Sequence, residues 1–321
     1  MHVYLSGAGQ LGSRYLQGIA KCMAISRITV VDPSKESLTR AIERYKETGG
    51  DSSLINTYLT LPNEICDVDL AIITTLSTVR KDVVSQLNCR TNIKNWILEK
   101  VLAPSIKEID SIERDLRVRS RAWVNTPRRT MPWYSKIKEH INKSNHNISP
   151  LSIEIMGSHW GLACNTIHFL DLAEWITDSY IQVCETSAQL HWQEAKRKGF
   201  LEAYGTLECA MEGGNSLKVS CTSEDNLPLT ISIKSENNNI TINEQEGYAF
   251  DKATSTLLPG KILFQSELTT SLVDKILADD ESALPTLATS AKQHRLFLKC
   301  LSRDLENSDY PWNPESSLPI T

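Results

Sequence analysis

Several features that would assign a protein class at once are missing from this 321-residue sequence. It has no apolar run close to ~18 residues, so no transmembrane helix is expected. An apolar strand pattern starts at the second residue, which leaves no room for the charged and apolar regions of a signal peptide. There is no internal repeat and no low-complexity tract. We therefore expect cytoplasmic localisation and no membrane partner.

The eight cysteines form neither a Cys-x-x-Cys pair nor any short Cys/His spacing. Zinc sites need such pairs, and small disulfide-framed domains need a dense cysteine pattern. Neither a metal site nor a disulfide framework is predicted. Apolar residues make up 40% of the chain and charged residues 23%. This is ordinary globular usage, so the chain is expected to fold around a sizeable core.

The formal net charge of −5 hides an uneven distribution, because residues 1–150 carry +7 and residues 151–321 carry −12. Between Arg114 and Lys143 there are nine Lys/Arg residues against two Asp/Glu residues. Such a run can bind nucleic acid. It lacks a known nucleic-acid recognition motif, however, and a small anionic ligand needs only one or two of these charges. We therefore expect two domains and no nucleic-acid partner.

Residues 1–125 alternate short apolar runs with helical patterns, as parallel βαβ units do. Their Val68–Ile73 run is nearly continuously apolar, which is typical of a central parallel strand buried on both faces. This part is predicted to be an N-terminal dinucleotide-binding Rossmann domain with a doubly wound parallel sheet. Ligands are expected at the carboxyl ends of its strands.

Residues 126–321 show a different pattern and are predicted to form a substrate-binding and oligomerisation domain. Alternating strands follow one another between about residues 180 and 264, with hairpin signals at 213–215 and 236–239. The fold class is therefore α/β, with an open, mostly antiparallel sheet in the second domain. A closing helix over 284–301 could pack back on the first domain. The tail after Asp309 is expected to be a surface strap or disordered.

Gly7-Ala-Gly9-Gln10-Leu11-Gly12 follows the first predicted strand directly and opens a helix, and Asp32 ends the next strand. Together these residues form the dinucleotide fingerprint. The glycines allow a tight turn, approach of the backbone to a pyrophosphate, and close packing of helix on strand. Asp32 can accept a hydrogen bond from a ribose 2′-hydroxyl and would repel a 2′-phosphate. The predicted cofactor is NAD, with NADP less favoured.

Two further segments carry candidate chemistry. Thr75 ends the fourth strand and Glu99-Lys100 follows the fifth, at the edge where a nicotinamide would lie. A partly desolvated lysine can take part in proton transfer there, although a surface ion pair explains the same residues. His168 lies three residues before Asp171 on a predicted helix, so it is either a general base or a helix residue bonded to Asp171.

These motifs, in this order, resemble the glucose–fructose oxidoreductase / inositol dehydrogenase / rhizopine catabolism (Gfo/Idh/MocA) family. The resemblance covers nearly the whole chain. It implies hydride transfer between NAD(P) and a sugar, cyclitol or sugar nucleotide in sugar or polysaccharide metabolism. It also implies a homodimer or homotetramer formed through the second sheet. Lys100 matches the lysine of the family's Glu-Lys-Pro signature, where the peptide bond is often cis, and His168 matches the catalytic histidine.

The chain departs from the family's pattern at two positions. Val101 replaces the proline of the signature, and Cys164 replaces the acidic residue usually found four positions before the histidine. A neutral thiol cannot raise the basicity of the histidine as a carboxylate does. Catalysis is therefore less strongly indicated than cofactor binding.

The residues expected around a sugar-type, anionic substrate follow the last strand of the first domain or lie within one helical turn of His168. Arginines offer paired donors to phosphate or carboxylate, and an aromatic face stacks on a sugar ring. These residues are Arg128, Arg129, Trp133, Asn165, Thr166 and His168. A basic helix start and core aromatics are the alternative explanation for the first three.

Three functions are consistent with these residues. The first is an NAD-dependent sugar-type dehydrogenase or reductase that uses Lys100 and His168. The second is a sensor or scaffold that keeps the NAD site without efficient chemistry, as Cys164 and Val101 permit. The third is imine or enone reduction on the same fold, for which the histidine would be dispensable.

Overall fold

The computed structural model describes residues 1–116, 120–144, 149–224, 226–279, 282–313 and 317–321. The chain divides into two compact units. The first unit contains Met1–Ala103, Lys107–Asn125 and Leu263–Ala291, and the second contains Pro104–Ile106, Thr126–Ile262 and Lys292–Thr321. The segment Leu263–Ala291 thus belongs to the first unit, whereas the sequence placed it in the second domain. The chain passes from the first unit to the second between Asn125 and Thr126, which is where the sequence pattern changes.

The first unit is built on a six-stranded parallel sheet with the strand order β3-β2-β1-β4-β5-β6. Its strands are β1 (His2–Ser6), β2 (Arg27–Val31), β3 (Ile55–Tyr58), β4 (Val68–Ile73), β5 (Ile93–Leu98) and β6 (Arg121–Val124). The order reverses between β1 and β4, where doubly wound sheets bind their ligands. The structure confirms the predicted Rossmann-type sheet.

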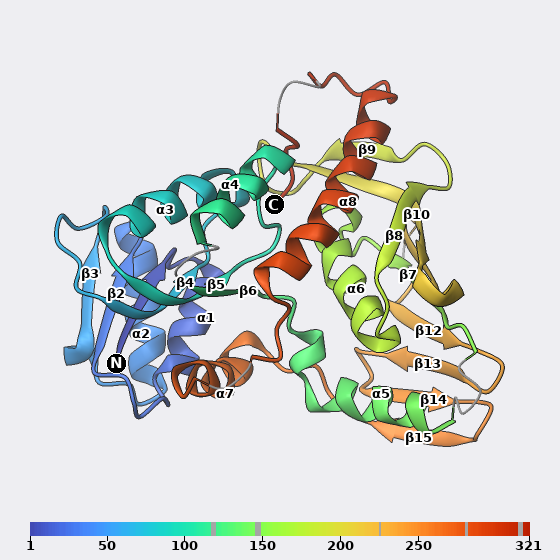
Figure 1. Ribbon diagram of the computed structural model, residues 1–321, viewed down its shortest axis with the longest axis horizontal. Helices are drawn as coiled ribbons and strands as arrows, with labels where there is room; N and C mark the ends of the chain where they lie inside the picture. The colour runs from blue at the N-terminus through green and yellow to red at the C-terminus, as the bar shows by residue number, and fades with distance from the viewer. Residues whose placement is uncertain (117–119, 145–148, 225, 280–281, 314–316) are drawn as a thin grey trace. The chain divides into compact units, whose positions relative to one another are not determined.

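Helices cover both faces of this sheet, as Figure 1 shows, with α3 and α4 on one side and α1, α2 and α7 on the other. The helices are α1 (Gln10–Ile19), α2 (Lys35–Glu47), α3 (Ser77–Arg90), α4 (Ile106–Leu116) and α7 (Gln265–Leu277), with a 3₁₀ turn, η1, at Ser52–Leu54. The α7 helix was not predicted from the sequence. It buries Leu272, Val273 and Ile276 in the same apolar cluster as Leu16 and Ile19 of α1.

The second unit contains a nine-stranded sheet with the order β15-β14-β13-β12-β7-β11-β10-β8, and β9 pairs with β10. Among the described strands, β7 and β11 pair in parallel and the other pairs are antiparallel. The strands are β7 (Ser152–Ser158), β8 (Ile181–Thr186), β9 (His191–Glu194), β10 (Leu201–Met211), β11 (Ser216–Thr222), β12 (Thr230–Lys234), β13 (Asn239–Asn243), β14 (Tyr248–Asp251) and β15 (Thr256–Pro259). The prediction of a mostly antiparallel sheet is confirmed.

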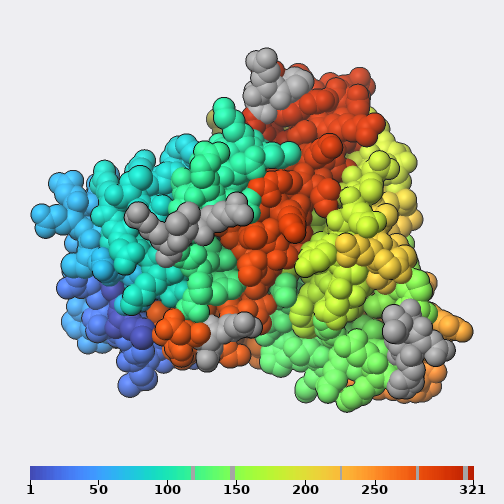
Figure 2. Space-filling view, in the orientation of Figure 1, coloured from blue at the N-terminus to red at the C-terminus, as the bar shows by residue number. Residues whose placement is uncertain are grey.

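Helices α5 (Pro132–Ser144) and α6 (Leu162–Thr177) pack on this sheet. The 3₁₀ turn η2 (Pro127–Thr130) directly precedes α5 in the sequence. A further 3₁₀ turn, η3 (Glu212–Gly214), joins β10 to β11. Helix α8 (Leu287–Glu306) begins in the first unit, and its part from Lys292 onward belongs to the second. That part is drawn as a red helix in Figure 1, and in Figure 2 red atoms of the same segment lie beside yellow-green atoms of the second unit.

The tail after Asp309 differs from the expectation of a surface strap or a disordered segment. Leu318 and Ile320 are buried, at 2% and 0% exposure. The Leu318 N–H donates to the Pro104 carbonyl at 2.9 Å, and the Leu201 N–H donates to the Pro319 carbonyl at 2.7 Å. Backbone hydrogen bonds and two buried apolar side chains therefore anchor residues 318–320 within the second unit.

Candidate functional site

The glycine turn between β1 and α1 is packed so tightly that two of its glycines have no room for a side chain. Gly7 has a φ of +94°, and a Cβ there would lie 2.7 Å from Thr74 Oγ1. A Cβ on Gly12 would lie 1.9 Å from the Gly7 carbonyl oxygen. Around Gly9, by contrast, a Cβ would meet no atom of the described residues within 4 Å. The turn is thus closed on the sheet side and open at the start of α1.

Side chains beyond the glycines hold this turn in place. Asp32, after β2, accepts hydrogen bonds from the Ala8 N–H at 2.6 Å and the Ser34 N–H at 2.8 Å. Thr74 donates its hydroxyl to the Gly7 carbonyl at 2.7 Å and to the Ser6 carbonyl at 3.1 Å. The sequence did not identify Thr74, because only the parallel pairing of β1 and β4 brings it to the turn. Asp32 still has lone pairs available, since an ionised carboxylate has about four acceptor sites.

Gln10 and Leu11, the other residues predicted in the turn, lie exposed in the first turn of α1. Arg44 of α2 donates to Gln10 Oε1 at 3.2 Å and to Ser13 Oγ at 2.5 Å. Within the described parts of the chain, no side chain caps the N-terminus of α1. The first N–H groups of a helix lack partners within it and carry a partial positive charge. This helix end is suited to an anion.

The ends of β4 and β5 supply the remaining predicted cofactor residues. The Thr75 hydroxyl oxygen is buried and has no hydrogen-bond partner among the described residues. Glu99 is also buried, and its Oε1 accepts hydrogen bonds from the Tyr15 hydroxyl at 2.9 Å and Asn125 Nδ2 at 2.7 Å. Burial raises the pKa of Glu99 despite these donors. Lys100 is half-buried, and the Lys100–Val101 peptide bond is cis.

His168 lies half-buried on α6, whose first turn is held by a residue that the sequence did not identify. The α6 helix starts after Gly161, which has a φ of +83° and offers no side-chain cap. Glu202 of β10 instead accepts a hydrogen bond from the Ala163 N–H. A Cβ on Gly161 would lie 2.9 Å from Cys164 Sγ and 3.0 Å from Glu202 Oε2. A carboxylate therefore lies near Cys164, although it comes from another element.

Asp171 ties α6 to the η2 turn. It is 1% exposed and accepts hydrogen bonds from the Thr126 hydroxyl at 2.8 Å and from Arg129 Nη1 at 3.1 Å. Burial raises the pKa of Asp171, and Arg129 and Thr126 oppose this rise. Arg129 Nε is buried and has no partner among the described residues. Asp171 thus orients Arg129, whose guanidinium keeps one free buried donor.

The hydroxyl and amide predicted beside His168 are engaged with the backbone of their own segment. Thr166 is fully buried and donates to the Leu162 carbonyl at 2.6 Å. Asn165 is half-buried and donates through Nδ2 to the Trp160 carbonyl at 2.7 Å. Both contacts stabilise the first turn of α6.

Arg128 and Trp133 are held inside the second unit. Arg128 makes a bidentate ion pair with Glu244, at 2.7 and 2.9 Å, and its guanidinium lies 4.5 Å from the Phe169 ring centre. Burial by itself raises the pKa of Glu244, but hydrogen bonds from Arg128 and its charge outweigh burial and lower the pKa. Trp133 is 4% exposed and donates to the Leu258 carbonyl at 3.1 Å. Both side chains have structural partners, and their role toward a substrate stays a prediction.

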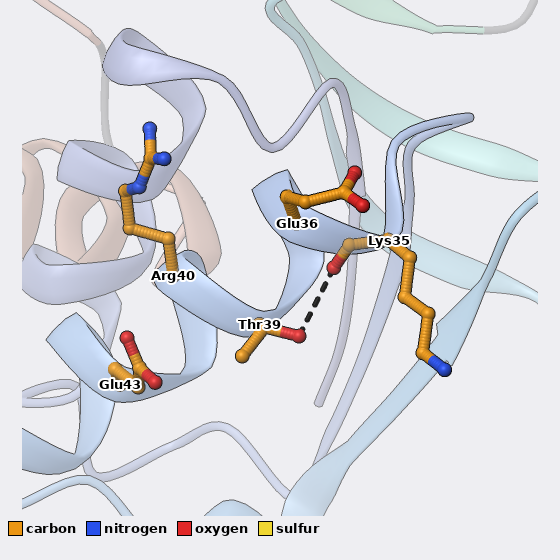
Figure 3. A pocket seen from close by; sticks show the side chains of 5 residues that line it. All are labelled: Lys35, Glu36, Thr39, Arg40 and Glu43. Atoms are coloured by element: carbon orange, nitrogen blue, oxygen red, sulfur yellow. Dashed lines mark hydrogen bonds between the residues drawn. The ribbon is translucent and has the colours of Figure 1, made fainter.

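A surface hollow of about 400 Å³ lies on α2 and contains none of the predicted site residues. Figure 3 shows the side chains that line it, with the Thr39 hydroxyl donating to the Lys35 carbonyl at 3.0 Å. The lining residues are Lys35, Glu36, Thr39, Arg40 and Glu43. Their charges are mixed, so the hollow has no clear preference for one ligand charge.

Two absences apply to the described residues alone. Within them, no group of three or more His, Cys, Asp or Glu side chains is arranged to hold a metal ion. No helix in the same part of the chain is long and apolar enough to cross a membrane.

No protein-family model and no curated protein matches the chain. Solved structures match it in fold. An oxidoreductase from Agrobacterium radiobacter in complex with NAD⁺, L-tartaric acid and magnesium has a TM-score of 0.73 at 14% identity, with 96% of both chains covered. Myo-inositol dehydrogenase from Lactobacillus casei in complex with NAD(H) and myo-inositol has a TM-score of 0.69 at 13% identity, with 98% of both chains covered.

A structure from another functional class also matches. The transcriptional regulator Gal80p from Kluyveromyces lactis has a TM-score of 0.71 at 16% identity, covering 96% of this chain and 93% of that chain. At such identities the matches establish the fold alone. The chain therefore has the two-sheet α/β fold that these oxidoreductases share with a transcriptional regulator.

Proposed function

We propose that this protein is an NAD-dependent oxidoreductase that transfers a hydride between the nicotinamide and a hydroxyl or keto carbon of a sugar, cyclitol or sugar nucleotide. The observation that carries this proposal is the open space at Gly9, in a turn where Gly7 and Gly12 are fully packed. A turn that served packing alone would have no need of a glycine at position 9. The solved oxidoreductases of the same fold with NAD⁺ or NAD(H) support the same cofactor.

The residues of the first unit fit a dinucleotide. The N–H groups at the start of α1 suit the pyrophosphate. Asp32 suits the ribose hydroxyls and disfavours the 2′-phosphate of NADP. The unpartnered Thr75 hydroxyl, Glu99 and Lys100 lie at the ends of β4 and β5, where the nicotinamide half belongs. Bound NAD supplies a ring carbon that accepts or returns the hydride.

The proposed chemistry of the chain itself is proton transfer and orientation. His168 takes the proton of the substrate hydroxyl during oxidation and returns it during reduction. Lys100 donates a hydrogen bond to the same oxygen and so stabilises negative charge that develops on it. Arg129, with its free buried Nε–H, is the proposed contact for an anionic substrate group. Arg128, Trp133, Asn165 and Thr166 shape the surroundings of these groups.

We also propose that the chain forms a homodimer or homotetramer through the second sheet. Met156 of β7 and Val183 of β8 are large apolar side chains that remain 40% and 45% exposed. Burial of such side chains against a second copy would favour association. Sedimentation of the wild type and of a Met156→Lys, Val183→Lys double variant tests this, and a wild type that sediments as a monomer contradicts it.

A regulatory NAD-binding protein is the second candidate. Cys164 stands where the family that the sequence resembles usually carries an acid, and a transcriptional regulator shares the fold. Such a protein would bind NAD(H) and respond to it without turnover.

Measuring NADH fluorescence and absorbance separates the two candidates. The purified chain is titrated with NADH, then incubated with NAD⁺ or NADH and a panel of cyclitols, sugars, hydroxy acids and sugar nucleotides. Turnover that falls at least about 100-fold in both Lys100→Ala and His168→Ala supports the enzyme. The matched controls Lys107→Ala and His191→Ala change exposed residues and should retain turnover. Binding without turnover supports the regulator, and no binding of NAD(H) contradicts both.

A further inference from the structure

Arg80 is a buried cation for which the proposed chemistry has no direct use. It lies on α3 and is 2% exposed. Transfer of a charge from water into a protein interior is unfavourable unless hydrogen bonds compensate for the lost water. A leucine or methionine would fill the same space without this cost. The partners of the guanidinium therefore indicate what the arginine does.

These partners are three backbone carbonyls at the ends of two neighbouring strands. Nη1 donates to the Val101 carbonyl and to the Leu102 carbonyl, the latter at 3.1 Å. Nη2 donates to the Thr75 carbonyl. A planar guanidinium can hold several carbonyls in a fixed relation, which a lysine or a neutral side chain cannot do. Arg80 thus joins the segment after β4 to the segment after β5.

The charge of Arg80 persists under physiological conditions. Burial lowers its pKa to about 10, and the nearby carboxylate of Glu99 opposes this shift. The side chain consequently remains protonated near neutral pH, and all of its N–H groups remain donors. The three carbonyls are held by a cation at any pH at which the protein would work.

The segments that Arg80 joins contain residues assigned to the cofactor. Thr75 has its carbonyl held by Arg80, while its hydroxyl is buried without a partner among the described residues. Leaving a buried hydroxyl without a hydrogen-bond partner destabilises a protein, and a bound ligand group can remove this cost by supplying the partner. Val101 and Leu102 directly follow Lys100, so their carbonyls fix the backbone from which the Lys100 side chain extends.

We propose that Arg80 is a positioning residue for the nicotinamide half of the cofactor, because it fixes Thr75 and the Lys100–Leu102 segment in one arrangement. This inference rests on the proposed function. It assigns Arg80 no contact with the ADP half of the cofactor, which the proposed function assigns to the Gly9 turn and Asp32. The two halves of the cofactor should therefore respond differently to its replacement.

The test compares two ligands on the full-length chain by calorimetry. NADH contains both halves, whereas ADP-ribose lacks the nicotinamide. In Arg80→Met we expect the Kd for NADH to rise about tenfold, which corresponds to the loss of one good hydrogen bond. The Kd for ADP-ribose should change less than about twofold, within the free-energy scatter of sites that do not interact. Lys81→Met, on the exposed side of the same helix, is the matched control and should change neither.

Each outcome has one meaning. If Arg80→Met raises the Kd for NADH and the Kd for ADP-ribose by the same factor, Arg80 has a purely structural role. If the Kd for NADH is unchanged, Arg80 has no role in binding. Either result overturns the inference while leaving the proposed function intact. If Arg80→Met fails to fold, Arg80→Lys replaces it, because it keeps the charge and loses the planar fork; the same selective loss of NADH is then expected with a smaller factor. Failure of the wild type to bind NADH overturns the proposed function, and this inference with it.

Discussion

Gly9 and Gly12 lie three positions apart in one turn and are required for opposite reasons. The Gly12 position is filled by the Gly7 carbonyl, whereas the Gly9 position borders open space. Gly9 also has a φ of −64°, which any residue can adopt. Gly12 thus allows α1 to pack on the sheet. Gly9 leaves room at the start of α1, where the proposed function places the cofactor pyrophosphate.

These roles predict different effects of the same substitution. Gly9→Ala should leave the melting temperature within about 2 °C of the wild type, because the methyl group meets no atom of the described residues. The same methyl group should block the pyrophosphate and raise the Kd for NADH at least about tenfold. Gly12→Ala should lower stability by about 1–3 kcal/mol as an overpacked site and lose NADH binding with it. Thermal melting and NADH titration of both variants measure this. Unchanged NADH binding in Gly9→Ala would contradict a dinucleotide at this turn.

Glu174 is a buried carboxyl group that accepts hydrogen bonds from two donors, one of which belongs to a side chain with an unpartnered oxygen. It accepts hydrogen bonds from the Ile181 N–H at 2.9 Å and from Gln293 Nε2 at 2.6 Å. Burial raises its pKa above the ordinary 4.5, and the neighbouring Asp171 adds to this rise. The Gln293 Oε1 atom is buried without a partner among the described residues. The Gln293 Oε1 atom is thus available to accept a further hydrogen bond.

Because the folded state holds this proton more tightly than the unfolded state, the carboxyl destabilises the fold increasingly as pH rises through the raised pKa. Glu174→Gln removes the titration, and a flipped Gln293 amide can accept the new N–H. We expect a melting temperature about 2–4 °C above the wild type at pH 8 and a smaller gain at pH 5. Glu194→Gln, at an exposed strand position, is the matched control and should change the free energy of unfolding by less than about 0.5 kcal/mol. An equal gain at both pH values would refute the titration.

A sequence pattern can mark residues that a fixed local spacing brings together. Gly7, Gly9, Gly12 and Asp32 form a motif, and their predicted positions around one turn match the structure. Thr74, Arg80 and Glu202 act through contacts with distant segments, and no local pattern marks them. Buried hydrogen-bonding partners of this kind become visible only once the strands are paired.

At the scale of elements, α6 shows how one strand stabilises the start of a helix. Gly161 provides no cap, and Glu202 of β10 accepts hydrogen bonds from the Ala163 N–H and, at 3.0 Å, from the Ala203 N–H. A carboxylate at a helix N-terminus also interacts favourably with the helix dipole. The helix that carries His168 therefore depends on β10 for its first turn.

Replacement of Glu202 should loosen this helix end. Glu202→Ala is expected to cost about 0.5–2 kcal/mol, as other lost helix caps do, and to raise hydrogen exchange at the first turn of α6. Glu208→Ala, on an exposed position of the same strand, should stay within about 0.5 kcal/mol of the wild type. Exchange measured by mass spectrometry on both variants distinguishes them, and equal protection of α6 in both would contradict the cap.

The elements that the sequence predicted are those with a strong single pattern. The near-continuous apolar run of β4 and the motif-bearing α1 are examples. Strands β8 to β15 lie within the segment of about residues 180–264 for which alternating strands were predicted, but their individual bounds become clear only in the structure. The α7 helix was missed, although its apolar residues recur at helical spacing. The helix follows the β-rich segment directly in the sequence, so its helical pattern was not separated from the strands. Its membership of the first unit is visible only in the folded structure.

At the scale of the whole molecule, the first unit is assembled from separate stretches of the chain. The α7 helix packs on α1 so closely that a Cβ on Gly18 would lie 2.5 Å from the Thr269 Cβ atom. Thr270 donates to the Gly18 carbonyl at 2.9 Å, and Asn125 donates to Gln265 at 2.8 Å. Residues 1–125 alone would therefore expose the apolar surface that α7 covers.

We expect a fragment of residues 1–125 to lack a cooperative thermal transition and to bind the dye ANS. Loss of Leu272, Val273 and Ile276 from the core removes about 1.5–3 kcal/mol for each side chain. That sum is a large part of the ~5–15 kcal/mol by which domains are stable. A second fragment, with 1–125 joined to 263–291 by a flexible glycine–serine linker, should melt cooperatively and bind NADH.

The hydrogen bond between Asn125 and Gln265 makes this linker short, because the two ends to be joined already lie close together. A third fragment with the same linker and Leu272→Asp, Ile276→Asp keeps the length and loses the apolar face, so it should behave as 1–125 does. Circular dichroism and NADH fluorescence of the three fragments complete the test. If residues 1–125 alone melt cooperatively and bind NADH as the joined fragment does, the first unit ends at Asn125 and α7 only covers it.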